Sequence, residues 1–516
     1  MSEPLSNVPD PAGDVAADSR YATNWFLVVL PVAIVAACAE LGTAILNNST
    51  LPLFYHLGLG ISLKVYPILM IPFFISEAVF KLPLGVLSDK YGRKPLMLGG
   101  ALVTIFTPIA LTLIHRTHYS VELSIMLGLG LLRLFDGLGG AALWPALYSY
   151  IGDVVAESKR GAALGLLNVV YMAGLALAFL AGGFADDMFG PVFTGDSSFG
   201  KQFNVVGQKL RTAGHAAMHR VALAGHHVFH HAAHHLTQPH PHPPLPIATA
   251  NHPVVDPLAA QLSRPEHYFP SFYLVSFLFG LCAIIIALTM RNPRKSAFGP
   301  GSKHAEEHSP AMSWADYLTA LKRVPQFMVL AFVAFVGIGC IAPLFKLFVV
   351  AQFHITEKAV GILMLKPTLL IAAIALPVGI LSDRWGKTRS VRLGFVLCSI
   401  GLWAIPVVHH YSSAEIGFVI AATLVGVGSV FAFPAWTALL TTLCTDSQRG
   451  TIVGAVSTAQ GIGILIGFIL GPWLAATLGR MAPFIAAASF VTVATLLSLV
   501  YVRECALKRP PAQGLV

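Results

Sequence analysis

Seven charged side chains lie well inside long apolar runs of this 516-residue chain. A charge inside a membrane-spanning helix costs a few kcal/mol or more, so such residues are candidates for function. Glu77 and Lys81 are four residues apart, and Arg133 and Asp136 are three apart. Both spacings allow an ion pair within one helix. The full set is Glu40, Glu77, Lys81, Arg133, Asp136, Lys346 and Lys366.

Glu40 is our first candidate for a proton carrier, because no basic residue lies near it in its own apolar run. A carboxyl group that faces a low-dielectric cavity holds a proton near neutral pH, which suits proton transfer. Lys346 lies at a similar depth in its own run, so a Glu40–Lys346 ion pair is the competing structural explanation. Glu77 and Asp136 are the alternative carriers, although a local ion pair would neutralise either of them.

Membrane-spanning helices must position these groups. Hydrophobic residues make up 55% of the chain and charged residues only 11%, whereas globular proteins have about 25% charged residues. A bilayer core needs roughly 20 apolar residues per helix, and the short alternating segments of a membrane β-barrel are missing. We therefore predict an all-α membrane protein with twelve transmembrane helices. They cover residues 25–47, 64–86, 96–115, 122–150, 161–184, 271–290, 326–350, 357–381, 391–409, 414–438, 450–478 and 482–502.

The distribution of Lys and Arg predicts the orientation, since short loops rich in these residues stay in the cytoplasm. With the N-terminus inside, the cytoplasmic segments hold 20 of them and the short outer loops hold four. We expect an inner-membrane protein with both termini cytoplasmic. The formal charge of +9 then reflects topology, and no nucleic-acid partner is expected. The polar residues 1–24 lack the features of a cleaved signal peptide.

Two loops repeat between the halves of the chain. Residues 83–94 read PLGVLSDKYGRK and residues 377–388 read PVGILSDRWGKT. A repeat at matching places indicates two homologous six-helix bundles. We expect Gly85 to let helices approach closely, Gly92 to form a tight turn at positive φ, and Arg93 to hold the loop inside. The expected parts are a tail (1–24), an N-terminal bundle (25–290), a cytoplasmic linker (291–325), a C-terminal bundle (326–502) and a tail (503–516).

The first of these loops resembles the signature of the major facilitator superfamily between helices two and three, Gly-x-Leu-x-Asp-x-x-Gly-Arg-Lys. The resemblance implies the major facilitator fold and transport by alternating access. In the family, the matching aspartate helps to latch the two halves together. This implies a conformational switch at Asp89 and, less directly, at Asp383; the alternative is a loop that only fixes topology. The matching residues are Gly85, Leu87, Asp89, Gly92, Arg93 and Lys94.

Residues 133–139, RLFDGLG, resemble the fourth-helix motif of proton-coupled drug exporters, in which the arginine is tied to proton transfer. The exporters usually have glutamine where Asp136 stands, so here a carboxylate can compensate Arg133. Residues 174–183 keep the outer glycines of the exporters' fifth-helix motif but replace its Gly-Pro with Ala-Phe. The resemblance implies a monomeric transporter that exports small amphipathic compounds in exchange for protons. A solute importer (symporter) and a non-transporting receptor are the alternatives.

Enzymatic activity is not expected. The spans contain no convergent set of nucleophile, base or metal ligands, and no phosphate-binding loop indicates ATP drive. No cofactor is therefore expected. The six cysteines have no paired spacing, so we interpret them as small packing residues.

A histidine-rich insert, expected to face outward, covers residues 185–270, and 11 of the 20 histidines lie between His215 and His252. Several are four residues apart, which on a helix would present imidazole pairs to Zn, Ni, Cu or Co. No Cys, Asp or Glu within the histidine tract fixes a geometry, so we expect incidental or sensory metal binding. A divalent-metal exporter is the alternative. The candidate ligands are His226, His230, His231 and His235.

Overall fold

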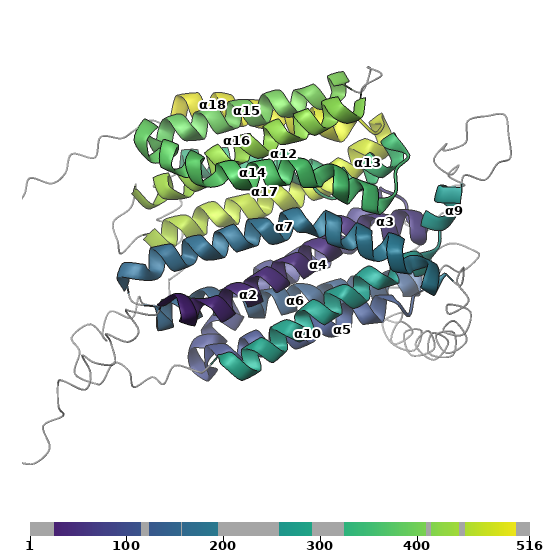
Figure 1. The fold of residues 1–516 in the computed structure, drawn as a ribbon, viewed down its shortest axis with the longest axis horizontal. Helices are drawn as coiled ribbons and strands as arrows, with labels where there is room; N and C mark the ends of the chain where they lie inside the picture. The colour runs from purple at the N-terminus through teal and green to yellow at the C-terminus, as the bar shows by residue number, and fades with distance from the viewer. Residues whose placement is uncertain are drawn as a thin grey trace, which may run out of the picture. The chain divides into compact units, whose positions relative to one another are not determined.

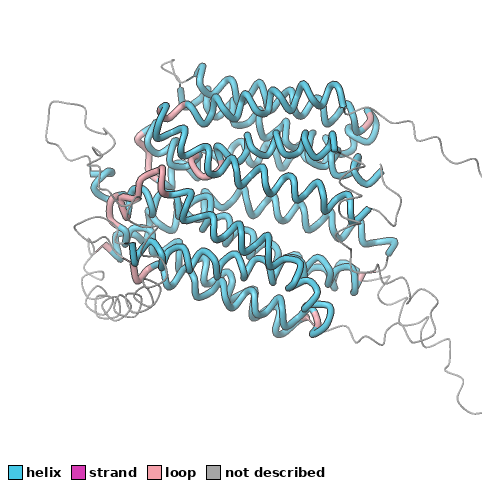
Figure 2. The backbone as a smooth tube through the Cα atoms, turned by 180° about the vertical axis from the view of Figure 1, so that it is seen from behind, coloured by secondary structure: helices cyan, strands magenta, loops and turns pink. Residues whose placement is uncertain are grey.

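The computed structural model of the protein describes residues 25–114, 123–155, 157–194, 257–290, 325–408, 414–442 and 449–501. In these residues the chain forms helices joined by short loops and contains no strand (Figure 2). The linker and most of the histidine-rich insert lie outside the described residues. The predicted all-α fold is confirmed, and the described residues form six long helices in each of the two halves that the family model matches.

The N-terminal half supplies six long helices (Figure 1). The first is α2 (Trp25–Ala44), which continues through η1 (Ile45–Thr50), α3 (Leu51–Leu53) and η2 (Phe54–Gly58). Next come α4 (Tyr66–Tyr91), α5 (Arg93–Leu111), α6 (Leu123–Val154) and α7 (Glu157–Phe193). After α9 (Pro257–Leu262) and η3 (Pro265–Tyr268), α10 (Phe269–Thr289) completes this half. Because α7 runs to Phe193, the first residues of the predicted insert are helical.

The C-terminal half repeats this order. Its first span consists of α12 (Pro325–Ile341) and α13 (Phe345–Phe353), separated by a turn that contains Pro343. It is followed by α14 (Glu357–Trp385), α15 (Lys387–Val408), α16 (Ala414–Thr442), α17 (Arg449–Leu478) and α18 (Ala482–Tyr501).

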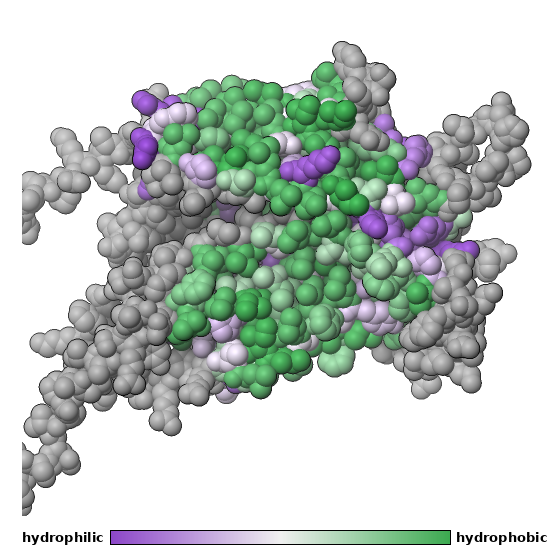
Figure 3. Space-filling view, in the orientation of Figure 1, coloured by the Kyte–Doolittle hydropathy of each residue, from purple (hydrophilic) through white to green (hydrophobic). Residues whose placement is uncertain are grey.

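The helices have the composition of membrane spans. Within the described residues, ten are long and apolar enough to cross a bilayer. The remaining two long helices are α4 and α14, which carry ionisable residues such as Glu77 and Lys366. Hydrophobic residues cover most of the visible face of the described helices (Figure 3). Helices that are apolar on all sides suit a lipid surrounding, and the chain is an integral membrane protein.

Contacts divide the described residues into two compact units. The first unit contains residues 25–50, the described residues between 69 and 194, and residues 264–290. The second contains residues 51–68, 257–263 and the C-terminal half. Residues 51–68 and 257–263 thus cluster with the second unit, whereas the sequence assigns them to the N-terminal bundle. The predicted bundle boundaries remain a prediction.

The end of the first helix is not a regular α-helix, which the apolar pattern did not predict. Residues 45–50 and 54–58 form π-helical turns on either side of Leu51–Leu53. Pro52 contributes to this irregularity because proline has no N–H group to donate along the helix. A π-turn bonds residue i to i+5 and is frequent at functional sites. Here it carries Asn47, whose side chain accepts a hydrogen bond from the buried Arg133.

Candidate functional site

Arg133 is the centre of a polar network in the first unit. It lies on α6 with 1% of its side chain exposed, and its Nη1 is 2.5 Å from Oδ2 of Asp136, which is 4% exposed. Three residues separate the two along the helix, so the ion pair forms within α6 itself. Leaving a buried charge without its partner is costly. Asp136 therefore compensates Arg133, as the departure from the exporter motif suggested.

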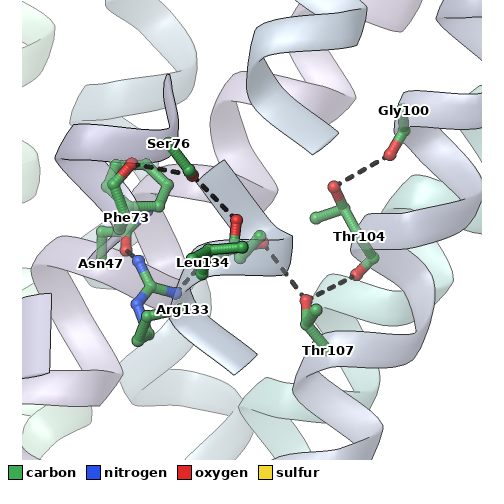
Figure 4. A network of polar contacts seen from close by, with 9 residues as sticks. Asn47, Phe73, Ser76, Gly100, Thr104, Thr107, Arg133 and Leu134 are labelled. Atoms are coloured by element: carbon green, nitrogen blue, oxygen red, sulfur yellow. Dashed lines mark hydrogen bonds and ion pairs between the residues drawn. The ribbon is translucent and has the colours of Figure 1, made fainter. Parts of the chain in front are cut away.

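Three other elements complete this network (Figure 4). Nη2 of Arg133 donates to Oδ1 of Asn47 on η1. The guanidinium carbon lies 4.6 Å from the ring centroid of Phe73 on α4, a cation–π geometry. Oγ1 of Thr107 on α5 donates to Oδ1 of Asp136 at 3.2 Å. Four consecutive spans thus converge on one buried ion pair, and Asn47 and Thr107 were not singled out by the sequence.

Gly137 explains why α4 and α6 come so close beside the network. A Cβ atom at this position would lie 2.1 Å from Oγ of Ser76 and 2.3 Å from the carbonyl oxygen of Phe73. The hydroxyl of Ser76 donates to the carbonyl oxygen of Leu134 at 2.8 Å, which joins the two helices directly (Figure 4). Only glycine fits this approach without a shift of one helix.

Glu40 lies in a second part of the same unit. It is on α2 and is 5% exposed, and the side chain of Tyr171 on α7 lies near it. A Cβ atom on Gly174 would lie 3.2 Å from Cβ of Glu40, so α7 covers this carboxyl closely. The Tyr171 ring lies 5.7 Å from that of Trp144 on α6. Among the described residues, no cationic side chain forms an ion pair with Glu40.

Glu77 and Lys81 form the local ion pair that their spacing predicted. Their charged atoms are 2.7 Å apart on α4. The side chains are 24% and 48% exposed, respectively, so this pair is not buried like that of Arg133. Glu77 is still close enough to Glu40 and Asp136 to act on both electrostatically. It thus belongs to the same acidic region.

Lys346 has a different partner from the one proposed on sequence grounds. Its Nζ donates to Oε2 of Glu357, at the start of α14, and both side chains are fully buried. Lys346 thus has a carboxylate partner in its own unit, and the Glu40–Lys346 pair remains an untested alternative. Sequence reasoning missed Glu357 because it lies just past a turn, where it reads as an ordinary first-turn acid.

The loop between α4 and α5 has the predicted turn. Gly92 has φ 101°, and Gly386 at the matching place in the second half has φ 97°. Arg93 donates from Nε to Oδ2 of Asp153 on α6 at 2.9 Å, and from Nη1 to Oγ of Ser88 at 3.1 Å. The Asp153 contact joins the loop to the end of α6, and no sequence pattern predicts it.

Two further expectations about this loop are not confirmed. No atom of the described residues would lie within 4 Å of a Cβ on Gly85, so the close helix approach expected there is not observed. Asp89 and Asp383 lie near the ends of α4 and α14, but their side chains are outside the described part of the structure. The switching role of these aspartates stays a prediction.

The predicted metal ligands His226, His230, His231 and His235 all lie outside the described residues. Within the described ranges, no group of three or more His, Cys, Asp or Glu side chains could hold a metal ion.

The helix ends next to the insert carry another polar cluster. Oδ1 of Asp186 accepts from the backbone N–H of Ser271 at 3.0 Å, which caps α10. Nε2 of the buried His267 lies 3.8 Å from Oδ1 of Asp187.

Six long helices in each half, with a glycine turn between the second and third, define a membrane protein with the architecture of a secondary transporter. The family model of the Major Facilitator Superfamily matches residues 32–195 and 327–515. The chain belongs to the major facilitator superfamily.

Individual relatives match shorter stretches. The chain is 31% identical over 136 residues to the multi-drug resistance efflux pump PmrA of Streptococcus pneumoniae, covering 26% of this chain and 29% of the pump. It is 28% identical over 173 residues to multidrug resistance protein 1 of Bacillus subtilis, covering 34% of this chain and 43% of that protein. Each alignment thus spans less than half of the relative's length.

Solved structures resemble this fold over nearly the whole chain. A D-xylose-proton symporter has a TM-score of 0.61 at 12% identity, covering 93% of this chain and 98% of the symporter. A bacterial homologue of the human lysosomal transporter Spinster has a TM-score of 0.57 at 18% identity, covering 92% of this chain and 94% of the homologue. At these identities the likeness shows the fold alone.

Proposed function

We propose that this transporter exports small amphipathic compounds in exchange for protons and that Glu40 carries the proton. The observation that carries the proposal is the environment of Glu40, a buried carboxyl that has no ion-pair partner in the described residues and lies close to α7. A carboxyl that is both buried and uncompensated can change its charge without breaking an ion pair. Such groups inside membrane spans typically belong to proton pathways.

The other ionisable groups are less suited to this role. Asp136 is tied to Arg133 and Thr107, and protonating it would leave a buried cation uncompensated. Glu77 is paired with Lys81 and is more exposed than Glu40. We assign the Arg133 network to positioning of the helices around Glu40, since it links α6 to the first, second and third spans.

Two weaker observations support the proposed direction of transport and the proposed class of substrate. PmrA is named a multi-drug resistance efflux pump, and its alignment with this chain favours export. Trp144, Tyr148 and Tyr171 lie beside Glu40, and Trp144 contacts both tyrosine rings. Aromatic rings next to a carboxyl suit compounds with an apolar body and a polar or cationic group. We place the protein in the inner membrane with both termini cytoplasmic, from the distribution of Lys and Arg.

The test is transport in proteoliposomes with an imposed pH gradient, screened against cationic drugs, sugars, organic acids and divalent metals. For the compound transported, Glu40→Gln should bind it as the wild type does but lose the response to the pH gradient. Glu77→Gln is the matched control and should keep that response. Unchanged proton dependence in Glu40→Gln would move the role to Glu77 or Asp136. Uptake driven by the gradient in the direction of proton flow would replace the exporter with a symporter.

A further inference from the structure

The short helix α9 packs with a different part of the chain from the helices that follow it. Contacts assign residues 257–263 to the second unit, whereas residues 264–290 belong to the first. Leu262 is 5% exposed and belongs to a hydrophobic cluster whose other buried members all lie in the C-terminal half, between Phe348 and Val491. Leu258, four residues earlier and hence on the same face of α9, is partly buried against this cluster. The apolar face of α9 is thus docked on the C-terminal half.

The segment directly after α9 is fixed to α7 instead. A Cβ atom on Gly190 of α7 would lie 2.5 Å from Nδ1 of His267 in η3, so the two elements are in close contact. The hydroxyl of Ser271, near the start of α10, donates to the carbonyl oxygen of Gly182 on α7 at 3.0 Å. All four residues belong to the first unit. η3 and the start of α10 therefore move with α7.

A single residue joins these two differently held segments. Ser263 ends α9, where its N–H and its hydroxyl donate to the carbonyl oxygens of Ala259 and Ala260 at 3.1 Å and 2.9 Å. Pro265 begins η3. Arg264 between them has an extended backbone, with φ −93° and ψ 119°, as a residue before proline favours. An extended residue spans at most about 3.6 Å, so this connection cannot lengthen further.

We propose that α9 and Arg264 form a strap that holds the two halves of the chain together on the side where α7 ends, the predicted outer side. The strap rests on the proposed transport by alternating access, but not on the substrate, the direction or Glu40. Opening on this side moves η3 with α7 away from the C-terminal half. Because Arg264 is already extended, Leu258 and Leu262 must then leave their cluster, and exposing them to water is unfavourable. The docked strap therefore favours the state that is closed on this side.

The experiment measures opening of this side by pulsed electron paramagnetic resonance on the full-length protein in nanodiscs. The native cysteines are replaced by serine, and spin labels are attached to Met188→Cys and Ile416→Cys, exposed positions near helix ends that the predicted topology places outside. In Leu262→Ala the ratio of long to short distances should rise about tenfold, because truncating a buried leucine weakens docking of the strap. Amide hydrogen exchange at residues 345–353 of α13, which belong to the same cluster, should also become faster.

Leu288→Ala is the matched control, because it makes the same truncation at a position of α10 that is 80% exposed, and it should change neither measurement. Helical content and elution volume verify that each variant is folded. Unchanged exchange at residues 345–353 would overturn the proposal, since α9 would not be docked there. Faster exchange with an unchanged distance ratio would overturn it as well, because α9 would dock without holding the halves together. A shifted ratio in a protein that transports none of the screened compounds would support the strap and count against the proposed function.

Discussion

Replacing Asp136 with asparagine removes the counter-charge of Arg133 while keeping the size of the side chain. Arg133 is 1% exposed and pairs with Asp136 at 2.5 Å, so the cation would remain buried. Breaking such a pair costs about 3–5 kcal/mol. The hydrogen bond to Asn47 and the Phe73 ring remain, which places the expected loss of unfolding free energy near the lower end, at about 3 kcal/mol.

A double-mutant cycle measures the coupling directly. The unfolding free energy is determined by denaturant titration in mixed micelles for Asp136→Asn, Arg133→Met and the combination. Because the double variant removes both charges, it should be more stable than the two single losses would sum to. We expect a coupling energy of about 3 kcal/mol. Glu77→Gln with Lys81→Met is the control, and this more exposed pair should couple by about 0.5 kcal/mol.

Two results would refute this reasoning. If the single losses add up in the double variant to within about 0.5 kcal/mol, the residues do not act as a pair. If the exposed pair couples as strongly as the buried one, burial is not what makes the interaction of Arg133 large. Either result would also remove the basis for assigning Arg133 to helix positioning.

Gly137→Ala should lower the unfolding free energy by about 1–3 kcal/mol through overpacking. Gly140→Ala on the same helix should not destabilise the protein, because its Cβ would meet no atom within 4 Å. Equal losses in the two variants would contradict this account of the α4–α6 contact. Asp89→Asn should insert normally but slow transport, and wild-type rates would argue against a switch. Deleting residues 201–255 should preserve transport of the main substrate while removing most divalent-metal binding; loss of metal efflux from cells that still insert the protein would favour the metal-exporter alternative.

The sequence predicted best those features that depend on a single helix or a single turn. Apolar runs located the long helices, most of them to within about five residues at each end, because each span must cover the bilayer core by itself. The first run and the fifth were predicted too short, since helix continues to Gly58 and to Phe193. The repeated loop predicted the positive φ of Gly92, since glycine adopts that conformation at little cost. The Glu77–Lys81 pair followed from spacing alone.

Contacts between helices were much less predictable. Tyr171 meets Glu40 and Asp153 meets Arg93 only after distant spans have packed, and neither partner has a sequence pattern that marks it. The π-turn that carries Asn47 was missed because the polar residues after Ile45 read as the end of the span. Glu357 was missed as the partner of Lys346 for the same reason. The sequence indicates how deep a residue lies along a helix, but not toward which neighbouring helix its side chain points.

The positions of the buried cations have a consequence for synthesis and insertion of the chain. Lys346 and Glu357 are separated by 11 residues, so at about 5–20 residues per second both are translated within roughly two seconds of each other. Arg133 and Asp136 leave the ribosome almost together. In both cases the neutralising carboxylate is available before the next full span has been made. Insertion of these helices therefore does not have to wait for the rest of the bundle, and a truncated chain that ends between Lys346 and Glu357 should insert its last helix less efficiently than one that ends after Glu357.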